Sequence, residues 1–139
     1  MTAYFGRRYM LSASHRLHCD GLTEDQNRAV YGKCNNPHGH GHNYIVEVLI
    51  GGAVSPETGM VINLVDLDAV VQTHVLDRFD LVNLNLDPLF TAQVPTTENL
   101  CREIFRIVRG SLPTDPPDLN LEYVRVEETE NNFFQCYNL

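Results

Sequence analysis

Hydrophobic and polar residues alternate, with interruptions, along residues 4–14, and this pattern predicts a β-strand. An apolar-rich stretch over residues 42–51 predicts a second strand. Near the end of the chain, residues 119–127 and 133–137 predict two more strands, joined by a hairpin turn over residues 129–132. The pattern therefore predicts two strands near each end of the chain.

Two amphipathic helices are predicted between these pairs of strands. Asn63 is a good helix N-cap, and the apolar positions that follow keep helical spacing to about residue 77. A second helix begins after Pro95, with threonines and an acidic residue in its first turn, and runs to Gly110. The predicted order of elements is ββααββ.

We expect an α+β fold, with a four-stranded antiparallel sheet and both helices on one of its faces. Residues 18–37 and 80–88 are predicted to be loops. No linker-like stretch divides the chain, so residues 1–139 are expected to form a single domain. The uncovered face and edges of such a sheet favour oligomerisation, by edge pairing or by closure of a β-barrel.

The composition excludes some partners. The chain has 18 acidic and 10 basic residues and a net charge of −8, which argues against nucleic acid and anionic membranes. No signal segment follows Met1, no apolar run is long enough to span a bilayer, and the four cysteines form no CxxC pair. We therefore expect a cytoplasmic protein that acts on a small molecule.

Three histidines form a candidate metal site. His40 and His42 are two residues apart at the start of a predicted strand, so their side chains point to the same face. His15 ends an earlier strand that can pair with this one. Three histidines suit catalytic zinc, which keeps a fourth position open for water or substrate. The alternative is that these histidines only decorate loops near glycines.

Basic residues are concentrated in the first third of this acidic chain. They are Arg7, Arg8, Arg16, Arg28 and Lys33, the only lysine. Such local basicity can receive an anionic substrate such as a phosphate ester. The alternative is that these residues are solvated surface cations, and the sequence alone leaves both interpretations open.

Many short motifs, spread over nearly the whole chain, resemble those of the 6-pyruvoyl-tetrahydropterin synthase family. The matching segments include Ser12-Ala13-Ser14-His15-Arg16-Leu17-His18, Gly32-Lys33-Cys34-Asn35-Asn36-Pro37, Gly39-His40-Gly41-His42-Asn43-Tyr44, Thr96-Thr97-Glu98-Asn99 and Glu128-Thr129. The resemblance implies the tunnelling fold shared by several pterin and purine enzymes.

The position of one cysteine separates the branches of this family. Cys34 lies six residues before His40, in the Cys-Asn-Asn-Pro form of the pyruvoyl enzymes. The related 6-carboxytetrahydropterin synthases typically place the cysteine four residues before the corresponding histidine. A third branch, which feeds folate synthesis, has glutamate in place of the cysteine. The resemblance therefore favours the pyruvoyl branch.

The resemblance implies a phosphate-eliminating carbon-oxygen lyase of tetrahydrobiopterin-type biosynthesis. Its substrate would be 7,8-dihydroneopterin triphosphate and its product 6-pyruvoyl-tetrahydropterin. Zn²⁺ held by His15, His40 and His42 would bind the substrate's side-chain oxygens, and Mg²⁺ is a candidate partner of the triphosphate. Cys34 would move protons as a thiolate, for which it needs positive charge from zinc or Lys33.

Four further residues match substrate-binding positions of the family. Glu128 matches the pterin anchor, and its carboxylate can accept two parallel hydrogen bonds from the ring's N3–H and 2-amino group. Thr96, Thr97 and Glu98 match positions that line the pterin pocket. Their alternative role is structural, because a threonine here can cap the helix and Glu98 can interact with its dipole.

One position departs from the family pattern. An Asp-His pair belongs to the family's proton-transfer system, but here Asp80 is followed by Leu81. The leucine side chain cannot accept or donate a proton, which leaves three alternatives. His38 or His74 replaces the histidine, the enzyme is slow or catalyses only part of the reaction, or the protein binds pterin without turnover. A 6-carboxytetrahydropterin synthase and a sepiapterin-forming or side-chain-cleaving variant are further alternatives.

The resemblance also implies a homohexamer, a dimer of trimers whose sheets form β-barrels. Its pockets would be shared between neighbouring subunits. In such an assembly Glu128 is a candidate to complete a pocket whose zinc belongs to the next subunit.

Overall fold

A single twisted sheet of five strands organises the molecule, whose computed structural model describes residues 1–138. The strand order is β3-β1-β2-β4-β5. Their bounds are Thr2–His15 (β1), His40–Ala53 (β2), Val82–Asn83 (β3), Asn120–Glu127 (β4) and Phe133–Tyr137 (β5). The four predicted strands are present and pair antiparallel, while the short β3, which was not predicted, pairs parallel with β1.

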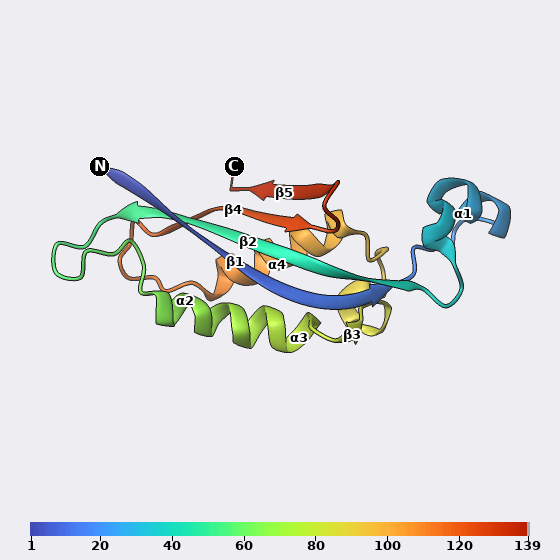
Figure 1. Ribbon diagram of the computed structural model, residues 1–139, viewed down its shortest axis with the longest axis horizontal. Coiled ribbons are helices and arrows are strands. Elements are labelled where there is room, and N and C mark those ends of the chain that lie inside the picture. The colour runs from blue at the N-terminus through green and yellow to red at the C-terminus, as the bar shows by residue number, and fades with distance from the viewer. Residues whose placement is uncertain (139) are drawn as a thin grey trace.

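Two long helical segments cover one face of the sheet, as predicted (Figure 1). The first comprises α2 (Leu64–Val71), a π-helical turn (Gln72–Leu76) and α3 (Asp77–Phe79), and the second is α4 (Thr97–Ser111). Asn63 caps α2 by accepting a hydrogen bond from the N–H of Val65. The core between helices and sheet includes Val46, Val48, Leu67, Val71, Leu100, Ile104, Val124 and Val126.

The prediction of a loop over residues 18–37 was wrong. This segment contains α1 (Glu24–Tyr31) and a 3₁₀ helix (Gly32–Asn35), and it lies beyond one end of the sheet (Figure 1). A capping box between Thr23 and Gln26 begins α1. The predicted loop over residues 80–88 likewise contains β3 and two short 3₁₀ turns.

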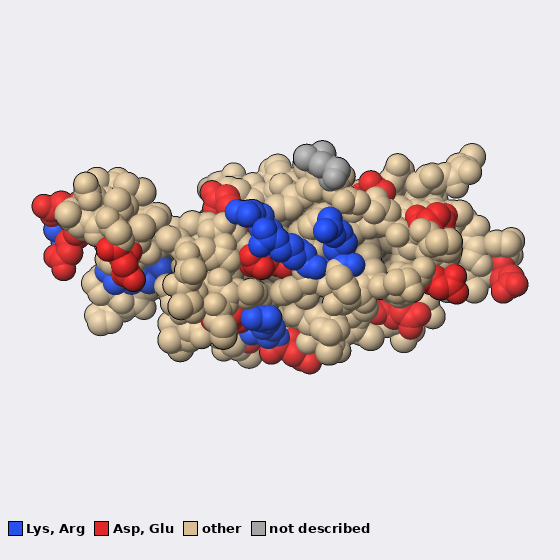
Figure 2. Space-filling view, turned by 180° about the vertical axis from the view of Figure 1, so that it is seen from behind, with Lys and Arg blue, Asp and Glu red and all other residues tan. Residues whose placement is uncertain are grey.

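The sheet face away from the helices is uncovered and carries both apolar and charged side chains. Tyr4, Met10, Phe133 and Tyr137 are exposed large hydrophobic residues of the strands. Charges of both signs are interspersed over the molecule, and the face shown in Figure 2 has basic side chains in its middle and acidic ones around them. Within residues 1–138, no helix is long and apolar enough to cross a membrane.

Candidate metal and substrate site

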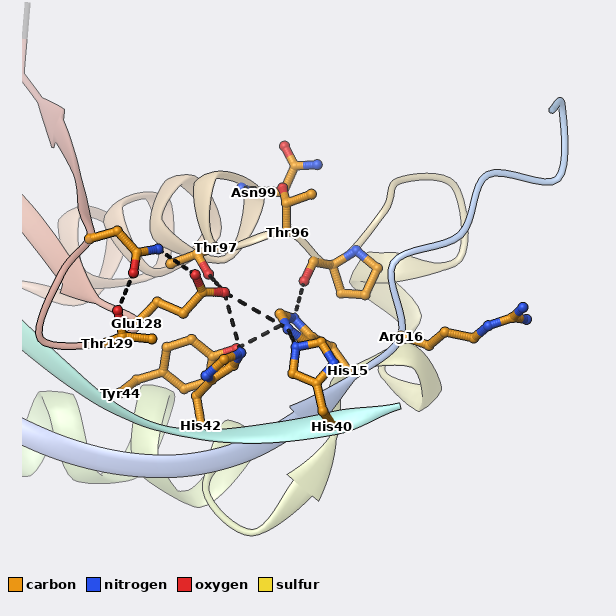
Figure 3. A network of polar contacts seen from close by, with 12 residues as sticks. His15, Arg16, His40, His42, Tyr44, Thr96, Thr97, Asn99, Glu128 and Thr129 are labelled. Atoms are coloured by element: carbon orange, nitrogen blue, oxygen red, sulfur yellow. Dashed lines mark hydrogen bonds and ion pairs between the residues drawn. The ribbon is translucent and has the colours of Figure 1, made fainter. Parts of the chain in front are cut away.

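The pairing of β1 and β2 brings three histidines together. His15 lies directly opposite His40, and His42 lies opposite Ala13. His40 and His42 are two residues apart, so their side chains share the sheet face that carries His15. One ring nitrogen from each of the three imidazoles lies within 4.8 Å of the others (Figure 3). The predicted juxtaposition of the three histidines is therefore present.

Hydrogen bonding fixes the tautomer of His15. Its Nδ1 lies 2.8 Å from the carbonyl oxygen of Pro95, which can only accept, so the imidazole donates from Nδ1. Its Nε2 therefore carries a lone pair and faces the Nε2 of His40 at 3.1 Å. Two nitrogens bound to one tetrahedral zinc lie about 3.3 Å apart, so this spacing suits a shared ion. A backbone carbonyl behind a ligand histidine is the usual orienting partner.

His42 gives an independent test of the fit to a metal. Its Nε2 is buried and has no hydrogen-bond partner within residues 1–138, an arrangement that costs free energy unless a ligand satisfies the nitrogen. Burial lowers the pKa of His15 and of His42 below the ordinary value, so both rings are neutral at physiological pH. Three imidazole nitrogens fit zinc with one coordination position left open.

Glu128 lies beside these histidines in the same chain (Figure 3). Its Oε1 is 3.5 Å from the Nε2 of His42 and 3.9 Å from that of His15, and it accepts a 2.8 Å hydrogen bond from the Thr97 hydroxyl. Burial favours a higher pKa for this carboxyl, but hydrogen bonds from Thr97 and Asn132 and the adjacent histidines outweigh it, and the pKa is lowered. Glu128 therefore lies beside the histidines of its own chain.

The three residues that begin α4 have different positions. Thr96 is the N-cap and accepts a hydrogen bond from the N–H of Asn99 at 3.2 Å. Thr97 is buried and faces Glu128, which joins it to the site. Glu98 is exposed in the first turn. Thr96 thus has the structural role of a helix cap, whereas Thr97 contacts Glu128, a candidate substrate-binding residue.

Cys34 lies in the 3₁₀ helix that precedes β2. Its carbonyl oxygen accepts a 2.9 Å hydrogen bond from the N–H of Leu17, which ties this segment to the chain just after His15. Burial, and secondly the negative charge of Glu128, raise the pKa of the Cys34 thiol above its ordinary value. The thiol is therefore protonated at neutral pH unless positive charge is added to the site.

Asp80 and Leu81 lie against β1 rather than against the histidines. The Oδ1 of Asp80 accepts a 2.8 Å hydrogen bond from the N–H of Ser12, and the N–H of Leu81 donates to the Ser12 carbonyl at 2.6 Å. Within the described chain, neither forms a hydrogen bond or ion pair with Cys34 or the three histidines. The Leu81 side chain is 83% exposed and borders a cavity of about 430 Å³ with Ser12.

The structure separates the two histidines that are candidates to replace the missing one. His38 borders a cavity of about 170 Å³ together with His15 and Arg16. His74 is exposed on the π-helical turn of the first long helix. His38 is therefore the candidate that shares a cavity lining with a residue of the three-histidine cluster.

The sequence analysis missed two residues of the site. Tyr44 is fully buried, and its hydroxyl lies 3.4 Å from the Nδ1 of His15. Its position two residues after His42 on the same strand was the available signal, because alternate residues share a face. Asn132 contacts Glu128 from the hairpin turn, and nothing in the local pattern distinguished it from an ordinary turn residue.

Comparison with known proteins identifies the family. The family model described as 6-pyruvoyl tetrahydropterin synthase matches residues 5–138. The chain belongs to the 6-pyruvoyl tetrahydropterin synthase family. It is 44% identical to the 6-pyruvoyl tetrahydrobiopterin synthase of Poecilia reticulata over 130 residues, 93% of this chain and 86% of that protein. It is 43% identical to the Homo sapiens protein of the same name over 131 residues, 94% of this chain and 88% of that protein.

A solved structure of this family has the same fold. The Caenorhabditis elegans 6-pyruvoyl tetrahydropterin synthase superposes with a TM-score of 0.92 at 36% identity, covering 100% of this chain and 97% of that one. The five-stranded sheet with helices on one face is therefore the tunnelling fold of the 6-pyruvoyl tetrahydropterin synthase family.

Proposed function

We propose that this protein is a zinc-dependent 6-pyruvoyl-tetrahydropterin synthase. It converts 7,8-dihydroneopterin triphosphate to 6-pyruvoyl-tetrahydropterin with elimination of triphosphate. The observation that carries the proposal is the cluster of three histidines with Glu128 at its edge. Cys34 in the pyruvoyl-type motif and the relatives named above support this branch over the 6-carboxytetrahydropterin one.

The histidines and Cys34 divide the chemistry between them. His15, His40 and His42 would hold zinc, which would supply Lewis acidity toward the substrate's side-chain oxygens. Cys34 removes a proton from the substrate side chain and returns one later in the reaction. Its raised pKa in the metal-free chain makes the thiolate dependent on positive charge in the site.

Glu128 anchors the pterin ring. Its lowered pKa keeps the carboxylate ionised, and hydrogen bonds from Thr97 and Asn132 orient it. A carboxylate matches the two parallel donors of the ring, N3–H and the 2-amino group. Thr97 is thus a residue that positions Glu128. For Thr96 and Glu98, a place in the pterin pocket rests on the family resemblance alone.

A second candidate function follows from Leu81. Neither its exposed aliphatic side chain nor its backbone contact with Ser12 supplies a titratable group. A pterin-binding homologue with weak turnover is therefore the alternative, and the other product branches are alternatives within the enzyme class. Asp80 matches the aspartate of the family's Asp-His pair. It can act as a catalytic residue only if its side chain reaches the active site of another subunit.

We also propose a homohexamer made of two trimers. The uncovered sheet face and the edges at β3 and β5 support oligomerisation, because exposed edges and apolar side chains favour pairing with another copy. Light scattering tests this proposal, and a monomer at micromolar concentration contradicts it.

The direct test of function is incubation of zinc-loaded protein with 7,8-dihydroneopterin triphosphate in the absence of a reductase. Triphosphate release together with the mass of the 6-pyruvoyl product is the expected result. A different pterin mass identifies another branch. Pterin binding without triphosphate release identifies the weakly active or inactive homologue.

A further inference from the structure

The five basic residues of the first third of the chain fall into two groups. Arg7 pairs with Asp68, Arg8 with Glu47, and Arg28 with Asp25. Arg16 and Lys33 have no carboxylate within ion-pair distance in residues 1–138. In a protein with a net charge of −8, two cations in the same segment that lack a carboxylate partner are candidates to bind an anionic ligand.

Arg16 is held in place before any ligand binds. Asn85 fixes its backbone on both sides, accepting from the Arg16 N–H at 2.7 Å and donating to the Arg16 carbonyl at 2.9 Å. The side-chain Nε donates to the carbonyl of Asn35 at 3.1 Å. The two terminal amino groups of the guanidinium stay available, and their planar fork suits the oxygens of a phosphate group.

Arg16 and Lys33 border the same cavity, which has a volume of about 400 Å³. His18, Arg28 and Asn36 also line this cavity, and Glu24 is the one carboxylate in the lining. Asn35 lines it too, but its side-chain amide is engaged with the Leu17 carbonyl and the Nδ1 of His18. Arg16 also borders the smaller cavity that contains His15. Arg16 therefore borders both cavities, and it directly follows His15, a member of the three-histidine cluster, in the chain.

The groups lie in a definite order along the site. In Figure 3, Glu128 and Arg16 lie on opposite sides of the three histidines. A ligand that spans this site meets first a carboxylate, then three metal-binding nitrogens, and finally a cationic cavity. Such an order matches a molecule with two N–H donors at one end, oxygens in its middle and a polyanion at the other end.

We propose that Arg16 and Lys33 form the binding site for the triphosphate group of the substrate. This inference rests on the proposed function for the identity of the ligand. Arg16 binds phosphate oxygens through its fork, and Lys33 adds an ammonium charge at the exposed rim of the cavity. Arg28 is a weaker contributor, because Asp25 already neutralises it.

Two probes that each carry one end of the substrate test the proposal. Inorganic tripolyphosphate represents the anionic end and neopterin the ring end, and calorimetry measures the binding of each to the zinc-loaded full-length protein. Arg16→Gln and Lys33→Gln are each expected to weaken tripolyphosphate binding about tenfold or more, because a hydrogen bond or ion pair to a charged group is lost. Neither change is expected to affect neopterin binding.

Matched variants separate a built site from general electrostatics. Arg102→Gln removes an exposed arginine of α4 that also lacks a carboxylate partner, and it is expected to leave tripolyphosphate binding unchanged. Arg16→Lys keeps the charge but loses the fork, so its binding should be intermediate. Equal weakening by Arg102→Gln, or no weakening by Lys33→Gln and Arg16→Gln, overturns the proposal. Lys33 is exposed, so its substitution also covers the case in which Arg16 variants fail to fold.

Further outcomes separate this inference from the proposed function. His40→Asn is expected to retain tripolyphosphate binding, whereas loss of binding in that variant alone assigns the anion to the metal and overturns the proposal. The Glu128→Gln variant should lose neopterin binding and retain tripolyphosphate binding. If neopterin does not bind the native protein, the proposed function fails while the anion site stands. If substrate turnover is normal in both Arg16→Gln and Lys33→Gln, the anion site fails while the function stands.

Discussion

Leu81 donates its backbone N–H to the carbonyl of Ser12 at 2.6 Å, while its own side chain lies in solvent. The backbone of Leu81 has a φ of 59°, in the left-handed region that leucine rarely occupies. The side chain of Asp80, the preceding residue, accepts a hydrogen bond from the Ser12 N–H. This turn therefore satisfies both the N–H and the carbonyl of Ser12. The turn in which Leu81 replaces the family's histidine therefore has a strained backbone, and its hydrogen bonds to Ser12 attach it to β1.

Leu81→Asn is expected to stabilise the protein by up to about 1 kcal/mol. Asparagine tolerates the left-handed conformation better than leucine, and little buried apolar contact is lost at an exposed position. Urea denaturation of the two proteins measures the difference. Leu86→Asn is the matched control, because Leu86 is 82% exposed but lacks a positive φ, and an equal gain there contradicts the strain argument.

Leu81→His is expected to raise the rate of triphosphate release if the missing proton-transfer group limits turnover. Such groups typically contribute about 10²- to 10⁴-fold, so even partial recovery should exceed about tenfold in kcat. The left-handed backbone accepts histidine better than leucine, so the fold should be retained. An unchanged or reduced rate means that another group already fills the role, and His38→Gln in the native background then tests the candidate beside His15.

Glu128→Gln is expected to weaken neopterin binding by about tenfold or more, since a carboxamide offers one acceptor where the ring presents two donors. Fluorescence quenching of the pterin measures the dissociation constant. Glu130→Gln changes an exposed acidic residue of the same turn and should have no effect. Equal affinity of native protein and Glu128→Gln removes Glu128 from the role of anchor.

The metal-free protein is expected to lose stability as the pH falls below about 6.5. Burial lowers the pKa of His15 and His42 in the folded state, so only the unfolded chain readily takes up protons there. The free energy of unfolding is therefore full above pH 6.5 and declines below it, by at most about 1.4 kcal/mol per pH unit for each histidine. His15→Gln should flatten this dependence in denaturation experiments between pH 5 and 8. If the slope of the unfolding free energy against pH is unchanged in this variant, the lowered pKa of His15 is contradicted.

Zinc loading is expected to accelerate alkylation of Cys34 by iodoacetamide at pH 7. In the metal-free chain its raised pKa keeps the thiol protonated, and an adjacent cation favours the reactive thiolate. Mass spectrometry assigns the modified cysteine, and Cys34→Ser removes the signal. Equal rates with and without zinc would show that the ion does not activate this thiol.

The sheet and the three-histidine cluster could be predicted from sequence because both depend on strong local periodicities. Alternating and apolar-rich stretches located the four main strands, and the two-residue spacing of His40 and His42 placed both rings on one face. His15 required only that its strand pair with theirs. The two helices followed from apolar spacing and from recognisable caps at Asn63 and Thr96.

The remaining elements lack such periodicity. Helix α1 buries only Asn27, so no apolar stripe marked it, although the capping box at Thr23 and Gln26 was a usable signal. Strand β3 has two residues, and its parallel pairing with β1 depends on tertiary contacts. The same holds for Asp80, whose contact with Ser12 joins residues 68 positions apart.

The arm that contains α1 is held by an amide rather than by an apolar core. The side chain of Asn27 donates to the carbonyls of Cys19, Leu22 and Thr23 and accepts the Cys19 N–H. Segments with few buried apolar groups open locally at a lower free energy than the core does. Amide hydrogens of the arm should therefore exchange with solvent well before those of β1 and β2. The arm leads directly into Lys33 and Cys34, so these two residues are expected to lie on the part of the molecule that opens first, whereas the three histidines lie on the paired strands β1 and β2.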